Sequence, residues 1–162
     1  MAELRNRKDV ELVKIDDRQQ FFDLHQNSFD IDVLIERSVN HSRALHTLKI
    51  FQDHGVPTVN TPEVAEICGS KFLTTQALIK TGIPTPRCFL AYIPESALAA
   101  MDQLGYPCVI KPTTGSWGRL ISKVNDRDAA EAILEHKQIL GSDHQAIFYI
   151  QEYVEKKGKD TR

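Results

Sequence analysis

Short apolar runs alternate with stretches of helical periodicity along the 162-residue chain. In the first half this pattern predicts a short helix over 2–8, strands over 10–15, 31–35 and 56–60, and helices over 43–54, 61–69 and 71–81. In the second half it predicts strands over 87–91, 108–111, 119–124 and 146–154, and helices over 95–104 and 129–140. Strands and helices that alternate in this way indicate an α/β or α+β fold.

Helix ends carry recognisable signals. Ser42 and Ser70 directly precede helical stretches. We predict both as N-caps, because a serine side chain accepts a hydrogen bond from the free N–H groups of a first turn. Gly82 ends the second of these helices, and the proline-bounded segment 83–86 that follows is predicted to be a linker. The pattern therefore predicts two domains, over residues 1–82 and 83–162.

Composition and charge exclude several classes of partner. Hydrophobic residues make up 41% of the chain and charged residues 26%, as in an average globular protein, so we expect a packed core. Lys and Arg total 20 against 22 Asp and Glu. The net charge of −2 gives no electrostatic footprint for nucleic acid and no polybasic segment for a membrane surface. The apolar runs are far shorter than the roughly 20 residues that cross a bilayer. We expect neither nucleic acid nor a membrane as a partner.

Cysteines and histidines form no metal-binding pattern. Cys68, Cys88 and Cys108 are isolated and never paired as CxxC, which argues against a zinc ribbon and against a disulfide framework. The six histidines form neither HExxH nor HxH. The charged N-terminus is unlike a secretory signal peptide, and together with the isolated cysteines it favours a reducing, cytoplasmic location.

The most informative stretch runs from Val109 to Val124. Lys111 ends an apolar strand there, and a turn with Gly115 and Gly118 follows. Glycines let the backbone approach a ligand closely, and successive N–H groups of such a turn can surround anionic oxygens, while the lysine adds a positive charge. The turn matches neither GxxxxGK[ST] nor GxGxxG. A tight hairpin turn with a solvated lysine would give the same pattern.

Two further stretches carry candidate binding groups. The strand over 146–154 ends in the sequence QEYV, where backbone N–H and C=O groups can hydrogen-bond to a flat heterocycle. An ordinary strand with an acidic end would have the same sequence pattern. Lys71 opens a helix, where a cation is mildly unfavourable unless an anion lies nearby. A solvated surface lysine is the plain alternative.

In this order and spacing, the motifs together resemble the ATP-grasp superfamily. The resemblance is carried by CGSK at 68–71, VIKP at 109–112, GSWGR at 115–119 and QEYVEK at 151–156. The residues of these motifs, GSWGR above all, are similar to those of the RimK/LysX branch, and the similarity extends from about Asp32 to Arg162. It implies a partial pre-ATP-grasp α/β domain, followed by the first ATP-grasp subdomain and the start of the second.

The resemblance implies a role for each matched position. Lys71 and Lys111 correspond to lysines that contact phosphate. The loop that closes over the triphosphate corresponds to Gly115, Ser116, Trp117, Gly118, Arg119, Leu120 and Ile121. The hinge that reads adenine through its backbone corresponds to Gln151, Glu152, Tyr153 and Val154. Asp160 and Arg162 fall in a nucleotide-contacting segment, where Thr161 replaces the isoleucine usual in the family.

The same resemblance implies a reaction and its partners. LysX-type enzymes use ATP and Mg²⁺ to join α-aminoadipate, or glutamate in the ArgX variant, to the C-terminus of LysW, a small acidic carrier protein, through an acyl phosphate. This belongs to lysine or arginine biosynthesis, and members of the branch often form homo-oligomers. A RimK-like glutamate ligase and a nucleotide-binding module without catalysis are the alternatives.

The positions of the family's catalytic groups fall outside this sequence. Catalytic residues and magnesium ligands are expected C-terminal to residue 162, so none is assigned within the chain. The first strand of the N-terminal domain is expected ahead of Met1. We therefore expect the chain to be an internal piece of a longer ligase, inactive by itself.

Overall fold

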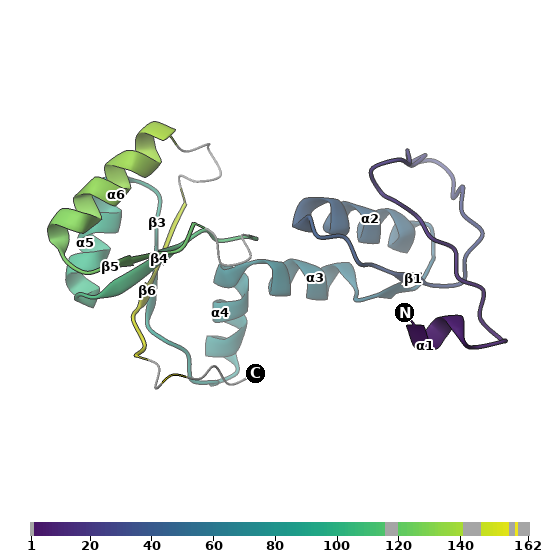
Figure 1. Ribbon diagram of the computed structural model, residues 1–162, viewed down its shortest axis with the longest axis horizontal. Helices are drawn as coiled ribbons and strands as arrows, with labels where there is room; N and C mark the ends of the chain where they lie inside the picture. The colour runs from purple at the N-terminus through teal and green to yellow at the C-terminus, as the bar shows by residue number, and fades with distance from the viewer. Residues whose placement is uncertain (1, 116–119, 141–146, 156–157, 159–162) are drawn as a thin grey trace. The chain divides into compact units, whose positions relative to one another are not determined.

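The computed structural model describes residues 2–115, 120–140, 147–155 and 158. Contacts divide the chain into two compact units, Met1–Glu66 and Ile67–Arg162. Figure 1 labels the helices and strands of both units. Their mixture of helices and strands confirms the predicted α/β or α+β class.

The first unit is built on a short parallel strand pair with a helix between the strands. β1 (Leu34–Ile35) pairs with β2 (Thr58–Val59), and α2 (His41–Asp53) connects them. α1 (Ala2–Arg5) begins the unit, and α3 (Pro62–Gly69) crosses into the second unit. Both strands were predicted, but they are shorter than the predicted ranges 31–35 and 56–60.

The core of the first unit lies between α2 and the strand pair. Leu48 and Phe51 of α2 are 1% exposed and pack with Leu34 of β1. The Phe51 ring also meets the rings of Phe22 and Phe29, with centroids 6.0 and 5.5 Å away. The segment ahead of β1 therefore joins this core through aromatic side chains.

The predicted strand over 10–15 is wrong. Exposure does alternate there, since Val10 and Leu12 are half-buried while Glu11 and Val13 are exposed, yet the segment joins no strand in the part of the chain that the structure describes. An alternating pattern becomes a strand only where a second strand supplies the hydrogen-bonding ladder.

The predicted cap of α2 is also wrong. The helix begins at His41, and its N-cap is Asn40, whose side chain accepts a hydrogen bond from the Arg43 backbone N–H at 3.0 Å. Ser42 lies inside the first turn, where its side chain is exposed. Asparagine and serine cap equally well, so residue type alone did not distinguish the two positions.

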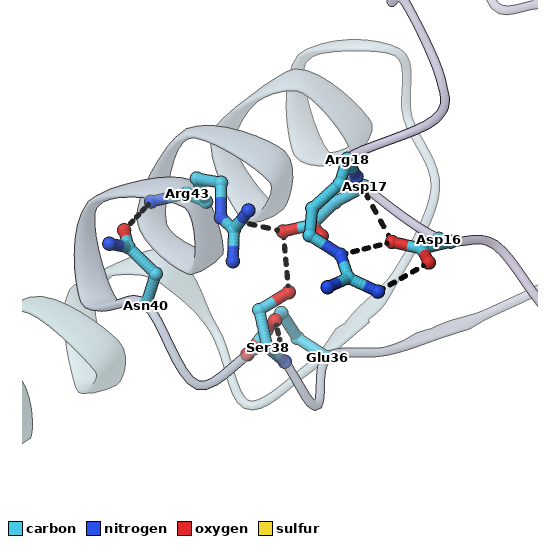
Figure 2. Close-up of polar contacts among 7 residues, drawn as sticks. All are labelled: Asp16, Asp17, Arg18, Glu36, Ser38, Asn40 and Arg43. Atoms are coloured by element: carbon cyan, nitrogen blue, oxygen red, sulfur yellow. Dashed lines mark hydrogen bonds and ion pairs between the residues drawn. The ribbon is translucent and has the colours of Figure 1, made fainter.

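Polar contacts tie the loop before β1 to the start of α2 (Figure 2). The carboxylate of Asp17 accepts a hydrogen bond from Ser38 Oγ at 2.9 Å and pairs with Arg43 Nε at 3.3 Å. Asp16 accepts two hydrogen bonds from the Arg18 guanidinium, at 3.0 and 2.8 Å, and these hold the pKa of Asp16 well below its usual range. Side-chain contacts therefore anchor this loop without a strand.

The second unit holds a four-stranded antiparallel sheet in the order β3-β6-β4-β5. Its strands are β3 (Cys88–Ala91), β4 (Cys108–Lys111), β5 (Ser122–Val124) and β6 (Phe148–Glu152). Its helices are α4 (Lys71–Lys80), α5 (Pro94–Leu104) and α6 (Arg127–Leu140). All seven elements were predicted, with ends that differ by a few residues.

α5 and α6 lie side by side on one face of this sheet (Figure 1). Every second strand residue points toward them, and these residues form the core with Met101 and Ala130 of the helices. The strand residues of this core are at most 5% exposed: Ala91, Cys108, Ile110, Val124, Phe148 and Ile150. The residues in between face the opposite side of the sheet.

The division between the units falls ahead of the boundary expected at 82–86. α4 belongs to the second unit because the Lys71 backbone N–H donates to the Thr113 carbonyl at 2.8 Å. Thr75 of the same helix is hydrogen-bonded to the Tyr149 hydroxyl at 2.7 Å. The proline-bounded segment therefore connects α4 and β3 within one unit.

Candidate functional site

The sheet face opposite α5 and α6 carries a group of polar side chains. The strand register pairs Lys111 with Tyr149 across β4 and β6, and Cys88 with Gln151 across β3 and β6. Because side chains alternate between faces and Ile110 points into the core, these four residues share the face opposite α5 and α6. The sheet thereby brings together two predicted site residues, Lys111 and Gln151.

Lys111 and Gln151 are in direct contact. The Lys111 ammonium donates a hydrogen bond to Gln151 Oε1 at 2.6 Å, and the lysine has a further interaction. Both side chains are half-buried. The charge at the end of β4 is therefore held at a defined place.

The start of α4 meets the end of β4. Ser70 caps this helix as predicted, since its Oγ accepts from the Leu73 backbone N–H at 3.3 Å. Ser70 also forms an isolated antiparallel bridge with Thr114, next to the contact between Lys71 and Thr113. The first turn of α4 and the residues Thr113 and Thr114 that follow β4 are thus neighbours.

Lys71 occupies an electrostatically unfavourable position. Burial lowers the pKa of its ammonium, because a low-dielectric surrounding penalises the charged form. The residue also opens α4, where the helix dipole is positive. An anion beside this helix start would relieve both penalties.

The glycine turn is described at its two ends. Gly115 has a φ of +43°, a backbone conformation that side chains disfavour. Leu120, with a φ of +59°, and Ile121 return the chain to β5, and both side chains are exposed. Six predicted site residues lie outside the described residues: Ser116, Trp117, Gly118, Arg119, Asp160 and Arg162.

The end of β6 divides the predicted hinge in two. Gln151 and Glu152 belong to the strand, and the Glu152 N–H donates to the Arg87 carbonyl at 2.9 Å. Tyr153 and Val154 follow the strand and are 39% and 52% exposed. The Lys123 ammonium lies 4.0 Å from the Tyr153 ring centroid, a cation–π contact that joins β5 to this segment.

Sequence reasoning missed the hydroxyl and thiol groups beside the lysines. The Tyr149 hydroxyl contacts Thr75 Oγ1 at 2.7 Å and Cys88 Sγ at 3.0 Å. One signal was present, since Thr75 follows Lys71 by four positions and such residues share a helix face. The partner strand of Tyr149 could not be read from the sequence.

Neither a metal cluster nor a membrane span is found in the described residues. No group of three or more His, Cys, Asp or Glu side chains converges there. No helix within this part of the chain is long and apolar enough to cross a bilayer.

Family comparisons match both halves of the chain. Residues 1–67 match the LysX preATP-grasp domain, and residues 68–162 match the RimK-like ATP-grasp domain. The border between these matches lies close to the division between the two structural units.

Curated relatives and solved structures are similar to the chain, among them the following three. The glutamate–LysW ligase ArgX of Sulfurisphaera tokodaii is 40% identical over 131 residues, which cover 81% of this chain and 46% of that protein. The α-aminoadipate–LysW ligase LysX of Saccharolobus solfataricus is 38% identical over 145 residues, with coverage of 87% and 53%. A RimK domain ATP-grasp protein of Sphaerobacter thermophilus superposes with a TM-score of 0.75 at 26% identity, covering 86% of this chain and 53% of that one. The chain spans about half the length of the curated relatives it matches.

Proposed function

Since the chain belongs to the RimK-like ATP-grasp family, as its motifs predicted, we propose that its second unit binds the phosphates of ATP. The binding place is the junction of the α4 start, the end of β4 and the glycine turn. One observation carries this proposal. The Lys71 backbone N–H donates to the Thr113 carbonyl at 2.8 Å, which brings two lysine-bearing elements to one turn.

The chemistry of this junction suits a polyphosphate. The first turn of α4 presents the positive end of the helix dipole, which favours anions. Lys111 adds a charge held by Gln151, and Lys71 adds a second charge that an anion would stabilise. Gly115 lets the turn backbone approach the phosphates closely.

We assign the remaining contacts by extension from this junction. The turn from Gly115 to Ile121 closes over the triphosphate. Tyr153 and Val154, which follow the strand, offer backbone groups to adenine, whereas the Glu152 N–H is already used within the sheet. Asp160 and Arg162 contact the nucleotide beyond this hinge.

The reaction we propose for the whole protein is ATP-dependent ligation of a carboxylate to an amine. The γ-phosphoryl group of ATP passes to a carboxylate, ADP leaves, and the resulting acyl phosphate is attacked by an amino group, which displaces inorganic phosphate and forms an amide. Phosphoryl transfer needs positioning and charge neutralisation more than covalent help from the protein. Lys71, Lys111 and the turn backbone supply both. Mg²⁺ would neutralise further phosphate charge, and we assign it no ligand among the described residues.

We propose LysW as the carrier and glutamate or α-aminoadipate as the amino acid. The names of the similar ligases support this choice, and so does the match of residues 1–67 to the LysX type of preATP-grasp domain. That match favours a LysW-type ligase over a RimK-like glutamate ligase.

The test is a change in carrier mass. The full-length protein is incubated with ATP, Mg²⁺, a LysW-type carrier and either amino acid, beside a Lys111→Met variant as the matched control. We expect the carrier to gain the mass of one amino-acid residue, and the variant to lose most of this activity. A carrier of unchanged mass with both amino acids, under conditions in which an ArgX or LysX ligase modifies it, would overturn the ligase assignment.

A further inference from the structure

α4 is attached to the second unit with little apolar burial. None of its residues is fully buried, whereas Ala97 and Met101 of α5 are buried against the sheet. In the described residues, two backbone contacts hold its start, the hydrogen bond from Lys71 to Thr113 and the bridge between Ser70 and Thr114. The orientation of the helix therefore depends on its polar contacts with the sheet.

One side-chain hydrogen bond links the body of α4 to the sheet within the described residues. Thr75 Oγ1 lies 2.7 Å from the hydroxyl of Tyr149, a residue of β6 that is 4% exposed. The same hydroxyl lies 3.0 Å from Cys88 Sγ, and the Cys88 thiol donates to the Pro86 carbonyl at 3.2 Å. Since the thiol proton is used there, the sulfur accepts from Tyr149, and the Tyr149 oxygen accepts from Thr75.

This chain of hydrogen bonds lies directly beside the two lysines. Thr75 follows Lys71 by four positions, so both side chains lie on one face of α4. Tyr149 is the cross-strand partner of Lys111 in the sheet register. The bond between Thr75 and Tyr149 therefore joins the helix face that carries one lysine to the strand position paired with the other.

We propose that Tyr149 is a positioning residue that sets the spacing between Lys71 and Lys111. It acts through the Thr75 hydroxyl, which turns the Lys71 face of α4 toward the end of β4. This inference rests on the proposed function, because the spacing matters only if both lysines bind one polyphosphate.

The test is a double-mutant cycle on the full-length protein, with the affinities for ADP and adenosine measured by calorimetry. Tyr149→Phe removes the hydroxyl and keeps the ring, and we expect it to weaken ADP binding by roughly threefold to tenfold. Adenosine, which has no phosphate, should bind both proteins equally. In a Lys71→Met background Tyr149→Phe should cause no further loss, because the residue acts through Lys71.

A second pair of variants separates positioning from folding. Thr75→Val removes the hydroxyl at nearly constant shape and should weaken ADP binding as much as Tyr149→Phe does. Thr75→Ser keeps the hydroxyl and should bind ADP with the affinity of the wild type. Tyr106→Phe is the matched control. The Tyr106 hydroxyl donates to Asp102 of α5, on the other side of the sheet, and its removal should leave ADP affinity unchanged.

The outcomes distinguish this inference from the function on which it rests. If Lys71→Met weakens ADP binding but Tyr149→Phe does not, or if the two losses multiply in the double variant, the positioning role is wrong and the nucleotide site stands. If the full-length wild-type protein does not bind ADP, or if neither Lys71→Met nor Lys111→Met changes its affinity, the proposed site is wrong and the positioning role falls with it.

Discussion

The ammonium of Lys111 lies 2.6 Å from Oε1 of Gln151, so the last residue of β4 is held by a side chain of the neighbouring strand β6. The two residues are 40 positions apart in the chain. They meet because β6 lies between β3 and β4, with Gln151 opposite Val109 and one step diagonal to Lys111. The sheet order thus links Lys111, at the end of β4, to the strand that leads into Tyr153 and Val154, the residues that we propose contact adenine.

Removal of the Gln151 acceptor should weaken nucleotide binding without removing a charge. We expect Gln151→Met, which keeps the length of the side chain, to lower ADP affinity by a few-fold, less than Lys111→Met, because the ammonium remains but is less well placed. Gln138→Met on the exposed side of α6 is the control. Calorimetric titration measures the ADP affinity of both variants. Equal affinities of Gln151→Met and Gln138→Met would contradict the role of this contact.

The core between the sheet and its two helices should dominate the stability of the second unit. Ile150 is fully buried in β6, so Ile150→Ala should lower the free energy of unfolding by about 2–5 kcal/mol. Ile139 on α6 is 70% exposed, and Ile139→Ala should change it by less than about 0.5 kcal/mol. Urea denaturation monitored by circular dichroism measures both. Similar losses for the two variants would show that this core is assigned wrongly.

The cap of α2 can be tested against the serine that the sequence suggested. Asn40→Ala removes the acceptor for the Arg43 N–H and should cost about 1 kcal/mol of unfolding free energy. Ser42→Ala changes an exposed residue inside the first turn and should have almost no effect. Denaturation curves of the two variants compare the positions directly. A larger loss for Ser42→Ala would restore the serine cap.

Tyrosine ionisation should report on the hydrogen-bonded hydroxyl of β6. Burial raises the pKa of Tyr149 to about 12, and the pKa of Tyr106 is raised to about 12 by burial and its bond to Asp102. A phenol in an unfolded chain titrates near about 10. The folded state therefore holds these protons more tightly, so their contribution to stability is complete below about pH 10 and is lost as the pH rises toward 12.

The measurement is the near-ultraviolet absorbance of tyrosinate as a function of pH. Two phenols of the wild-type chain should titrate late, and Tyr149→Phe should remove one of them while the Tyr106 phase remains. A late phase of unchanged size in Tyr149→Phe would contradict the buried hydroxyl.

Local patterns predicted most elements of the fold because helices and strands are specified over a few neighbouring residues. The Ser70 cap, the glycine stop at Gly82 and the apolar strand that ends at Lys111 could all be read in this way. The strand over 10–15 failed for the opposite reason. Its alternation is present in the exposure pattern, but a strand depends on a partner elsewhere in the chain.

The site could be predicted only as separate pieces. Lys71 and Lys111 were found through motifs, and the resemblance to the ATP-grasp superfamily gave them roles. That Lys71 meets Thr113, and that Tyr149 lies between Thr75 and Cys88, follows from strand order and register. Those depend on contacts between distant segments, which no local window contains.

The central claim is that the second unit binds an adenine nucleotide through Lys111 and Lys71. Titration of the full-length protein with ADP in a calorimeter tests it, with Lys111→Met, Lys71→Met and, as control, Lys80→Met at the exposed end of α4. Charge-assisted contacts contribute about 1.5–3 kcal/mol. We therefore expect Lys111→Met to weaken binding roughly tenfold or more. Lys71→Met should weaken it less, because no residue of α4 is fully buried and its lysine is held less rigidly than Lys111. Lys80→Met should leave the affinity unchanged. Equal affinity of the wild-type chain and Lys111→Met would contradict the account.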